Sequence, residues 1–172
     1  MRIVAGKWRG RRIDPPPDER VRPTGDRVRE AWMSIVNPWL AGARVLDLFS
    51  GSGALGFEAL SRAAAVVDFV DASATSIAAI RKNAEALGAG AGAQIHRADA
   101  LGFAETLEAH AYDVAFADPP YDLGLATRVA ERWLDVPFAD ILGIEHRVNE
   151  QLPGDGERRK YGNTVITLYR SP

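Results

Sequence analysis

VLDLFSGSGALGFEAL, residues 45–60, is the stretch that decides the fold expected for this chain. An apolar run leads into Gly51, Gly53 and Gly56, and an apolar helical pattern follows. Glycines allow a sharp turn and let a ligand approach the backbone beside a helix N-terminus. The stretch predicts a buried strand, a tight loop and a helix. The loop is interpreted as a binding site for a nucleotide-like ligand, with a turn that binds nothing as the alternative.

Short apolar runs and helical patterns alternate along the rest of the chain. The expected strands are at 43–49, 66–70, 93–97, 112–117 and 140–146, and the expected helices are at 54–62, 74–87, 100–108 and 124–134. This alternation is typical of a parallel sheet with helices on both faces. Two β-like runs separated by Gly162-Asn163 indicate an antiparallel C-terminal hairpin. We therefore expect one α/β, Rossmann-like domain with a mostly parallel, seven-stranded sheet.

The N-terminal segment has a different character, and we expect residues 1–22 to form a basic β-hairpin arm beside a main domain at 23–172. Two short β-like runs, 3–4 and 11–13, flank a glycine turn, and a helix capped by Thr24 is expected before Pro38. Residues 1–29 hold nine Lys or Arg against four Asp or Glu, although the whole chain has a net charge of −2. This asymmetry indicates a polyanionic partner, with a solvated tail as the alternative.

Composition excludes several other classes of protein. The chain has 172 residues, about one domain, and no cysteine, which excludes disulfides and thiolate chemistry. Its three histidines lack metal-ligand spacing, so no metal is expected. No apolar run approaches the ~18 residues of a membrane span, and no secretory signal is visible. A cytoplasmic location without membrane association is the expectation.

Two acidic residues near the glycine loop narrow the identity of the ligand. Asp71 ends the second expected strand, 20 residues after Gly51, where an acid binds a ribose diol in doubly wound folds. Asp47 lies inside the first strand, where a buried charge is costly unless it is paired. It can organise an α-ammonium group. S-adenosylmethionine carries both a ribose and an α-ammonium, and an exposed strand-end acid remains the alternative for Asp71.

A third acidic residue follows the third expected strand. The Asp99 carboxylate can accept a hydrogen bond from an adenine amino group, and the backbone N–H of Ala100 can donate to a ring nitrogen. Asp99 can equally cap the helix expected at 100–108. The two roles are compatible.

The fourth expected strand runs into ADPPYD, residues 117–122. It should end beside the first strand, at the edge where doubly wound sheets bind ligands. Asp118 and the carbonyl of Pro119 offer two acceptors on a stiff loop, and Tyr121 offers a ring for stacking. These groups suit a planar aromatic –NH₂ group, whose nitrogen would be directed at a methyl donor. The alternative is a simple turn after a strand.

Four segments together carry a family resemblance: LDLFSGSGALGFEALSR (46–62), ADPPYD, RIVAGKWRGRRI (2–13) and RPTGDRVREA (22–31). The chain resembles the bacterial S-adenosylmethionine-dependent guanine-N2 methyltransferases of small-subunit ribosomal RNA. The resemblance implies a methyltransferase domain in which Asp118 and Tyr121 hold the target base. Asp71 and Asp99 would contact the cofactor, and Arg22 and Thr24 would border the active site. The neutral VDASATS (70–76) departs from the charged residue that often follows the ribose acid in the family.

The resemblance also implies a ribosomal RNA partner, either free or as an assembled particle. The arm would bind it through Lys7, Arg9, Arg11 and Arg12 on phosphates, with Trp8 as a stacking surface. Three alternatives stay open: an adenine-N6 methyltransferase of DNA or RNA, a nicotinamide-dependent oxidoreductase, and a non-catalytic RNA-binding module. The oxidoreductase leaves Asp47 and the ADPPYD stretch unexplained.

Overall fold

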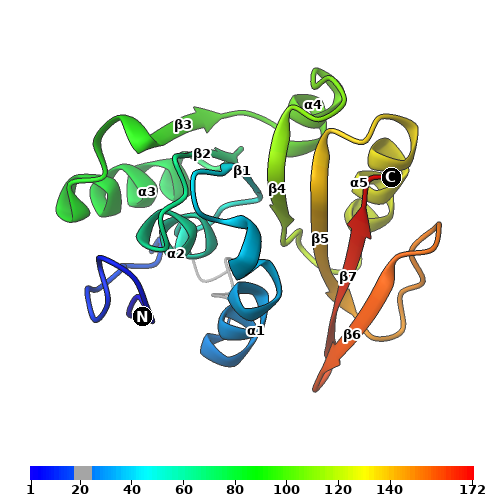
Figure 1. The fold of residues 1–172 in the computed structure, drawn as a ribbon, viewed down its shortest axis with the longest axis horizontal. Coiled ribbons are helices and arrows are strands. Elements are labelled where there is room, and N and C mark those ends of the chain that lie inside the picture. The colour runs from blue at the N-terminus through cyan, green and yellow to red at the C-terminus, as the bar shows by residue number, and fades with distance from the viewer. Residues whose placement is uncertain (18–24) are drawn as a thin grey trace.

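The computed structural model describes residues 1–17 and 25–172, and its centre is one mixed sheet (Figure 1). The strands are β1 (Arg44–Leu48), β2 (Val66–Asp71), β3 (Ala93–Arg97), β4 (Tyr112–Ala117), β5 (Ala139–Arg147), β6 (Glu157–Tyr161) and β7 (Thr164–Arg170). The helices are α1 (Asp26–Val36), α2 (Ala54–Ser61), α3 (Ala74–Leu87), α4 (Ala100–Glu105) and α5 (Leu125–Asp135), with 3₁₀ turns at Asn37–Trp39 and Gly90–Gly92.

The seven strands lie in the order β3-β2-β1-β4-β5-β7-β6. Neighbours among β1 to β5 pair in parallel, and β7 pairs antiparallel with both β5 and β6. The expected α/β fold with its antiparallel C-terminal hairpin is therefore confirmed. The direction of the strand order reverses between β1 and β4, which is the position where such sheets bind ligands.

Helices cover both faces of the sheet (Figure 1). Alternate residues of β1 face opposite layers: Val45 belongs to the core cluster with α1, α2 and α3, and Leu46 belongs to the cluster with α4 and α5. This alternation follows from the two-residue period of a strand. The central strands β1, β4 and β5 are buried on both sides almost throughout, which explains their largely apolar sequences, whereas the edge strands β3 and β6 are partly exposed.

Helix α1 is anchored on the two strands that end near the ADPPYD corner. The Trp32 ring meets Phe116 of β4 edge-on, with ring centroids 5.2 Å apart. On β5, a Cβ added to Gly143 would lie 2.0 Å from the same indole. Only a glycine leaves room for Trp32 at this position, so the pair fixes α1 against the sheet.

The N-terminal arm packs on the body of the domain. It forms an isolated antiparallel bridge between Arg2 and Arg12 rather than two regular strands. The Lys7 N–H donates to the Ser61 carbonyl at 2.9 Å, and the Ser61 hydroxyl donates to the Ala5 carbonyl at 2.6 Å. Backbone groups of the arm also pair with each other, as in the Ile3 N–H donating to the Arg11 carbonyl at 2.9 Å, so the arm is held both internally and by helix α2.

Two helix ends differ from the expectation by more than one residue or in their capping residue. Helix α4 ends at Glu105 rather than 108, because the Arg132 guanidinium from α5 donates to the carbonyls of Ala104, Glu105 and Leu107. The guanidinium thus satisfies carbonyl groups at the helix end that the N–H groups of a further turn would otherwise satisfy. At the start of α1, Gly25 occupies the N-cap position, and the expected cap, Thr24, lies outside the described residues.

Candidate active site

The loop between β1 and α2 turns through three residues with positive φ. They are Phe49 (58°), Gly51 (56°) and Gly53 (82°). Gly53 is the N-cap residue of α2, where a Cβ would lie 2.7 Å from the Phe57 ring. Gly56 instead permits close packing, because its Cβ would lie 2.3 Å from the Phe69 ring. The glycines therefore serve two needs, a left-handed turn and close contact between α2 and β2.

A cavity of about 730 Å³ opens beside this loop, at the carboxyl ends of the parallel strands. Its volume is within the range of about 300–1,000 Å³ that is usual for small-molecule sites. The wall includes eight of the residues expected to bind the cofactor or the target base: Asp47, Gly51, Asp71, Asp99, Ala100, Asp118, Pro119 and Tyr121. Gly53 provides a left-handed backbone conformation in the loop but does not line the cavity.

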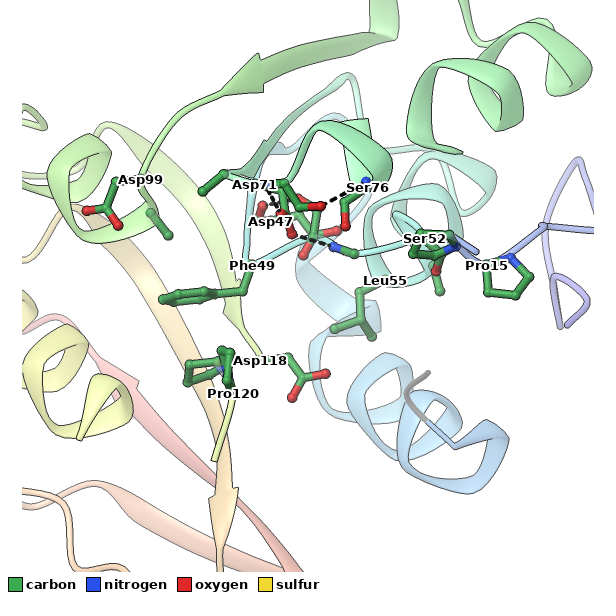
Figure 2. A pocket seen from close by; sticks show the side chains of 18 of the residues that line it. Pro15, Asp47, Phe49, Ser52, Leu55, Asp71, Ser76, Asp99, Asp118 and Pro120 are labelled. Atoms are coloured by element: carbon green, nitrogen blue, oxygen red, sulfur yellow. Dashed lines mark hydrogen bonds between the residues drawn. The ribbon is translucent and has the colours of Figure 1, made fainter. Parts of the chain in front are cut away.

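The acidic residues lie on different sides of this cavity (Figure 2). Asp47 and Asp71 lie together at the glycine loop, and Asp118 lies across the cavity from them. Asp99 and Pro15 are at opposite ends of the view. A ligand bound along the loop would therefore reach from the Asp99 end towards the ADPPYD corner.

Asp47 is a buried carboxyl group on the cavity wall, 2% exposed. Its Oδ2 accepts a hydrogen bond from the Gly56 N–H at 3.1 Å. Burial raises its pKa well above the ordinary aspartate value, the Gly56 bond opposes this shift, and the nearby Asp71 charge adds to it. A cation placed in the cavity beside Asp47 would restore its ionised form.

Asp71 links the second strand to the glycine loop. Its Oδ2 accepts from the Gly51 N–H at 2.9 Å, and its Oδ1 accepts from the Ser73 N–H at 2.9 Å. A carboxylate held by two backbone donors has a fixed orientation and still has lone pairs for hydroxyl groups of a ligand. Asp99 has the capping role that was one of its two interpretations, since its Oδ2 accepts from the Gly102 N–H at 2.8 Å. It is also on the cavity wall.

The ADPPYD corner follows β4 directly. Pro119 is buried and Pro120 is exposed, and both line the cavity with Asp118. The Tyr121 hydroxyl lies 2.9 Å from Thr164 Oγ1 and 3.5 Å from Glu145 Oε1. The corner thus presents a carboxylate, a rigid backbone and a tyrosine to one cavity.

Several residues of the cavity wall were not expected from the sequence. Phe49, Leu55 and Leu123 contribute apolar surface, and Pro15 and Pro16 bring the arm to the rim of the cavity. No periodicity distinguishes such residues from ordinary core and loop positions. The proline run was visible in the sequence, but its proximity to the glycine loop depends on the tertiary packing of the arm.

Ser76, in the first turn of α3, is another missed residue. It is 1% exposed and lines the cavity, and its Oγ has no hydrogen-bond partner in the described structure. A buried polar atom without a partner is costly, so it indicates a group that a ligand could satisfy. A serine inside an ordinary helical pattern gives no sequence signal for this role.

The residues expected to bind RNA separate into three groups. Lys7, Arg9, Arg11 and Arg12 are exposed on the arm, as phosphate binding requires. The expected stacking role of Trp8 does not fit the structure, because its ring is 7% exposed and packs edge-on against Phe57 with centroids 6.5 Å apart. The third group, Arg22 and Thr24, lies outside the described residues.

Docking of the arm explains the burial of Trp8. Gly6 adopts a φ of +87°, and a Cβ there would lie 1.9 Å from the Ser61 carbonyl oxygen. This close approach lets the Trp8 N–H donate to Ser61 Oγ at 3.0 Å and turns the indole into the core. The aromatic residue of the basic segment is therefore an anchor for the arm.

The family described as "Conserved hypothetical protein 95" matches residues 1–170, nearly the whole chain. The chain belongs to this family. Ribosomal RNA small subunit methyltransferase D of Haemophilus influenzae is 39% identical over 128 residues, 73% of this chain and 66% of its own length. The protein of that name in Escherichia coli K12 is 38% identical over 125 residues, 73% of this chain and 62% of its own. This member of the Conserved hypothetical protein 95 family thus spans slightly less than two thirds of the length of these two relatives.

Other relatives match this family member over its full length. Bacillus subtilis YlbH, provisionally named an rRNA methyltransferase, is 32% identical over 184 residues, 99% of this chain and 98% of its own. The solved structure of Escherichia coli yhhF, provisionally named a methyltransferase, has a TM-score of 0.84 at 32% identity and covers 99% of this chain and 97% of its own. A Thermus thermophilus protein of unassigned function, TTHA0928, has a TM-score of 0.83 at 28% identity, with 99% of both chains covered.

Membrane-spanning helices and metal-binding clusters are both absent from the described residues. No helix in the described part of the chain is both long and apolar enough to cross a membrane. Across residues 1–17 and 25–172, no group of three or more His, Cys, Asp or Glu side chains is arranged to hold a metal ion.

Proposed function

We propose that this chain transfers a methyl group from S-adenosylmethionine to the N2 amine of a guanine in small-subunit ribosomal RNA. The observation that carries the proposal is the shared cavity, in which Asp118, Pro119 and Tyr121 face the wall formed by Asp47, Gly51 and Asp71. The names of the Haemophilus influenzae and Escherichia coli relatives support ribosomal RNA as the substrate class. Because the chain spans only part of those relatives, its activity and its partner are proposals.

The residues around the glycine loop fit the proposed cofactor. Asp47 is a buried carboxyl group that needs a cation, and the α-ammonium of the cofactor would supply one. Asp71 is oriented for the ribose hydroxyls, and Ala100 and Asp99 would receive the adenine edge. Ser76 has a buried hydroxyl without a partner on the same wall. When bound, S-adenosylmethionine supplies a methyl group on a positively charged sulfur.

The ADPPYD corner would hold the amine that receives the methyl group. Its N–H groups would donate to the Asp118 carboxylate and the Pro119 carbonyl, which favours a pyramidal nitrogen with a directed lone pair. Positioning of this kind can supply about 7–11 kcal/mol of the barrier reduction in favourable cases. Asp118 can then accept the proton that the nitrogen loses once it is methylated. Tyr121 would stack on the base after its nucleotide has been turned out of the RNA.

The decisive experiment is methylation of defined RNA with a tritiated methyl donor, followed by mass mapping of the nucleosides. Small-subunit RNA and assembled subunits, both from cells that lack this gene, are the substrates. We expect N2-methylguanosine at a discrete position. Methylated adenine would instead assign the chain to the adenine-N6 class, and absence of methyl incorporation into both substrates would contradict the proposal. Calorimetry with S-adenosylmethionine and with NAD separates the methyltransferase from the oxidoreductase.

The exposed arginines of the arm give a further prediction. Arg9→Ala with Arg12→Ala should weaken RNA binding and lower the slope of log K against log salt by about 0.7–0.9 for each lost phosphate contact. Arg128→Ala is the matched control, because Arg128 is exposed on α5, which packs on the opposite face of the sheet. Fluorescence anisotropy at several salt concentrations measures both quantities. An unchanged slope in the double variant would show that the arm does not contact phosphates.

A further inference from the structure

Tyr121, the tyrosine of the ADPPYD corner, contacts residues of the C-terminal strands β5 and β7. Its hydroxyl lies 2.9 Å from Thr164 Oγ1, and Thr164 Oγ1 lies 3.2 Å from Glu145 Oε1. A carboxylate only accepts hydrogen bonds. Thr164 Oγ1 also lies 3.1 Å from the His146 carbonyl oxygen, so its one proton goes to that carbonyl or to Glu145, and in both cases the tyrosine hydroxyl can donate to Thr164. Donation from Tyr121 to Thr164 and from Thr164 to Glu145 links the tyrosine to the carboxylate. This chain of two hydrogen bonds is defined here as the hydroxyl relay.

A cation fixes the ring of the same tyrosine. The guanidinium of Arg147, the last residue of β5, lies over the Tyr121 ring with its Cζ 4.6 Å from the centroid, a cation–π contact. Arg147 is itself held by Asp122, with Nε 3.2 Å from Oδ1. One face of the ring is therefore covered by the protein, while Tyr121 also lines the cavity.

The relay ends at Glu145, a buried carboxylate whose removal from water costs free energy. Glu145 is 3% exposed on a strand with apolar neighbours, and its Oε2 has no hydrogen-bond partner among the described residues. A buried carboxylate with an unsatisfied oxygen destabilises a fold in comparison with an apolar residue of similar size. Such a group at the back of a binding cavity indicates a functional role, since it offers little to stability.

We propose that Glu145 and Thr164 are positioning residues that act through Tyr121. The relay fixes the tyrosine hydroxyl and Arg147 covers one ring face, so that the target base can stack only on the opposite face, beside Asp118. The inference rests on the proposed methyl transfer to RNA and adds the determinants that orient the base. Neither residue touches the cofactor wall, so cofactor binding is independent of the relay.

A double-mutant cycle tests the relay with minimal change of shape. Tyr121→Phe and Thr164→Val each remove one hydroxyl group. Each should lower kcat for RNA methylation about 10-fold, because a misplaced base reacts slowly. The KM for RNA and the calorimetric Kd for S-adenosylmethionine should stay within about twofold of wild type, since phosphate contacts dominate RNA affinity. The double variant should be no slower than the slower single variant, because both changes break the same relay.

Three further variants separate positioning from a structural role. Thr167→Val is the matched control: Thr167 is a buried threonine of β7 whose Oγ1 lies 2.6 Å from His146 Nε2, away from Tyr121, and its kcat should be unchanged. Glu145→Gln keeps an acceptor for Thr164 and should retain activity. Glu145→Met removes the carboxylate that Thr164 and Tyr121 contact and should lose about 10-fold in kcat with an equal or higher Tm.

Two results would overturn the relay. One is wild-type kcat in both hydroxyl variants, and the other is independent losses that multiply in the double variant. Both require a wild-type protein that methylates RNA. A wild-type protein without any transfer would instead contradict the proposed function itself, and the two failures are therefore distinguishable.

Discussion

Asp118→Ala and Asp118→Asn should strongly slow methyl transfer and leave cofactor binding intact. Asp118 lies across the cavity from the glycine loop, on the side of the ADPPYD corner (Figure 2). Alanine removes the acceptor for the amine and the carboxylate that takes its proton. Asparagine keeps one acceptor oxygen but cannot take the proton. We expect kcat to fall about 10²–10⁴-fold, the usual range for a positioned proton acceptor, with the larger loss in the alanine variant.

Single-turnover methylation and calorimetry measure this prediction together. The Kd for S-adenosylmethionine should be unchanged in both variants, which would localise the defect to the acceptor side. Asp135→Asn is the control, because Asp135 is an exposed carboxylate at the end of α5. Wild-type turnover in both Asp118 variants would remove the ADPPYD corner from the mechanism, and with it the main support for the proposed function.

The sheet and the cavity could be predicted from local sequence. The central strands β1 and β4 are buried on both faces and therefore have short apolar sequences, and the turn after β1 requires glycine at Gly53, where φ is positive. Chain order then implies that β1 and β4 end side by side, which brings Asp118 to the glycine loop. Strand periodicity and the usual strand order of doubly wound sheets are sufficient for these predictions.

The remaining features depend on tertiary contacts that leave no pattern in the sequence. Trp8 lies in a basic, glycine-containing arm and looks like an exposed stacking residue, yet the close approach of Gly6 to Ser61 turns it into the core. Glu145 lies on a buried strand, and nothing in the sequence distinguishes it from a structural residue. Its contact with the corner depends on the tertiary packing of β5 and β7, which brings both Glu145 and Thr164 to the Tyr121 hydroxyl.

Asp47→Asn should weaken cofactor binding and, unusually for a site variant, stabilise the free protein. Asparagine keeps an acceptor oxygen for the Gly56 N–H but has no charge to pair with the α-ammonium. Removing one partner of a buried, hydrogen-bonded charge pair costs about 2–5 kcal/mol, so the Kd for S-adenosylmethionine should rise at least ~30-fold. Calorimetry measures this, with Asp113→Asn as the control at an exposed carboxylate outside the cavity.

The effect on stability follows from the raised pKa of Asp47. Burial raises this pKa in the folded protein above the unfolded value of about 3.9, so the folded state holds the proton more tightly. The stabilising contribution of the protonated group is complete below that unfolded value and is lost as the pH rises towards the folded pKa. Asp47→Asn should therefore raise Tm at pH 7 and have a smaller effect near pH 4.

In wild type, cofactor affinity should rise with pH over the same window, because only the ionised carboxylate pairs with the ammonium. An equal Tm difference at both pH values would contradict the raised pKa of Asp47 in the free protein. A Kd unaffected by the substitution would show that Asp47 is not the partner of the charged end of the cofactor.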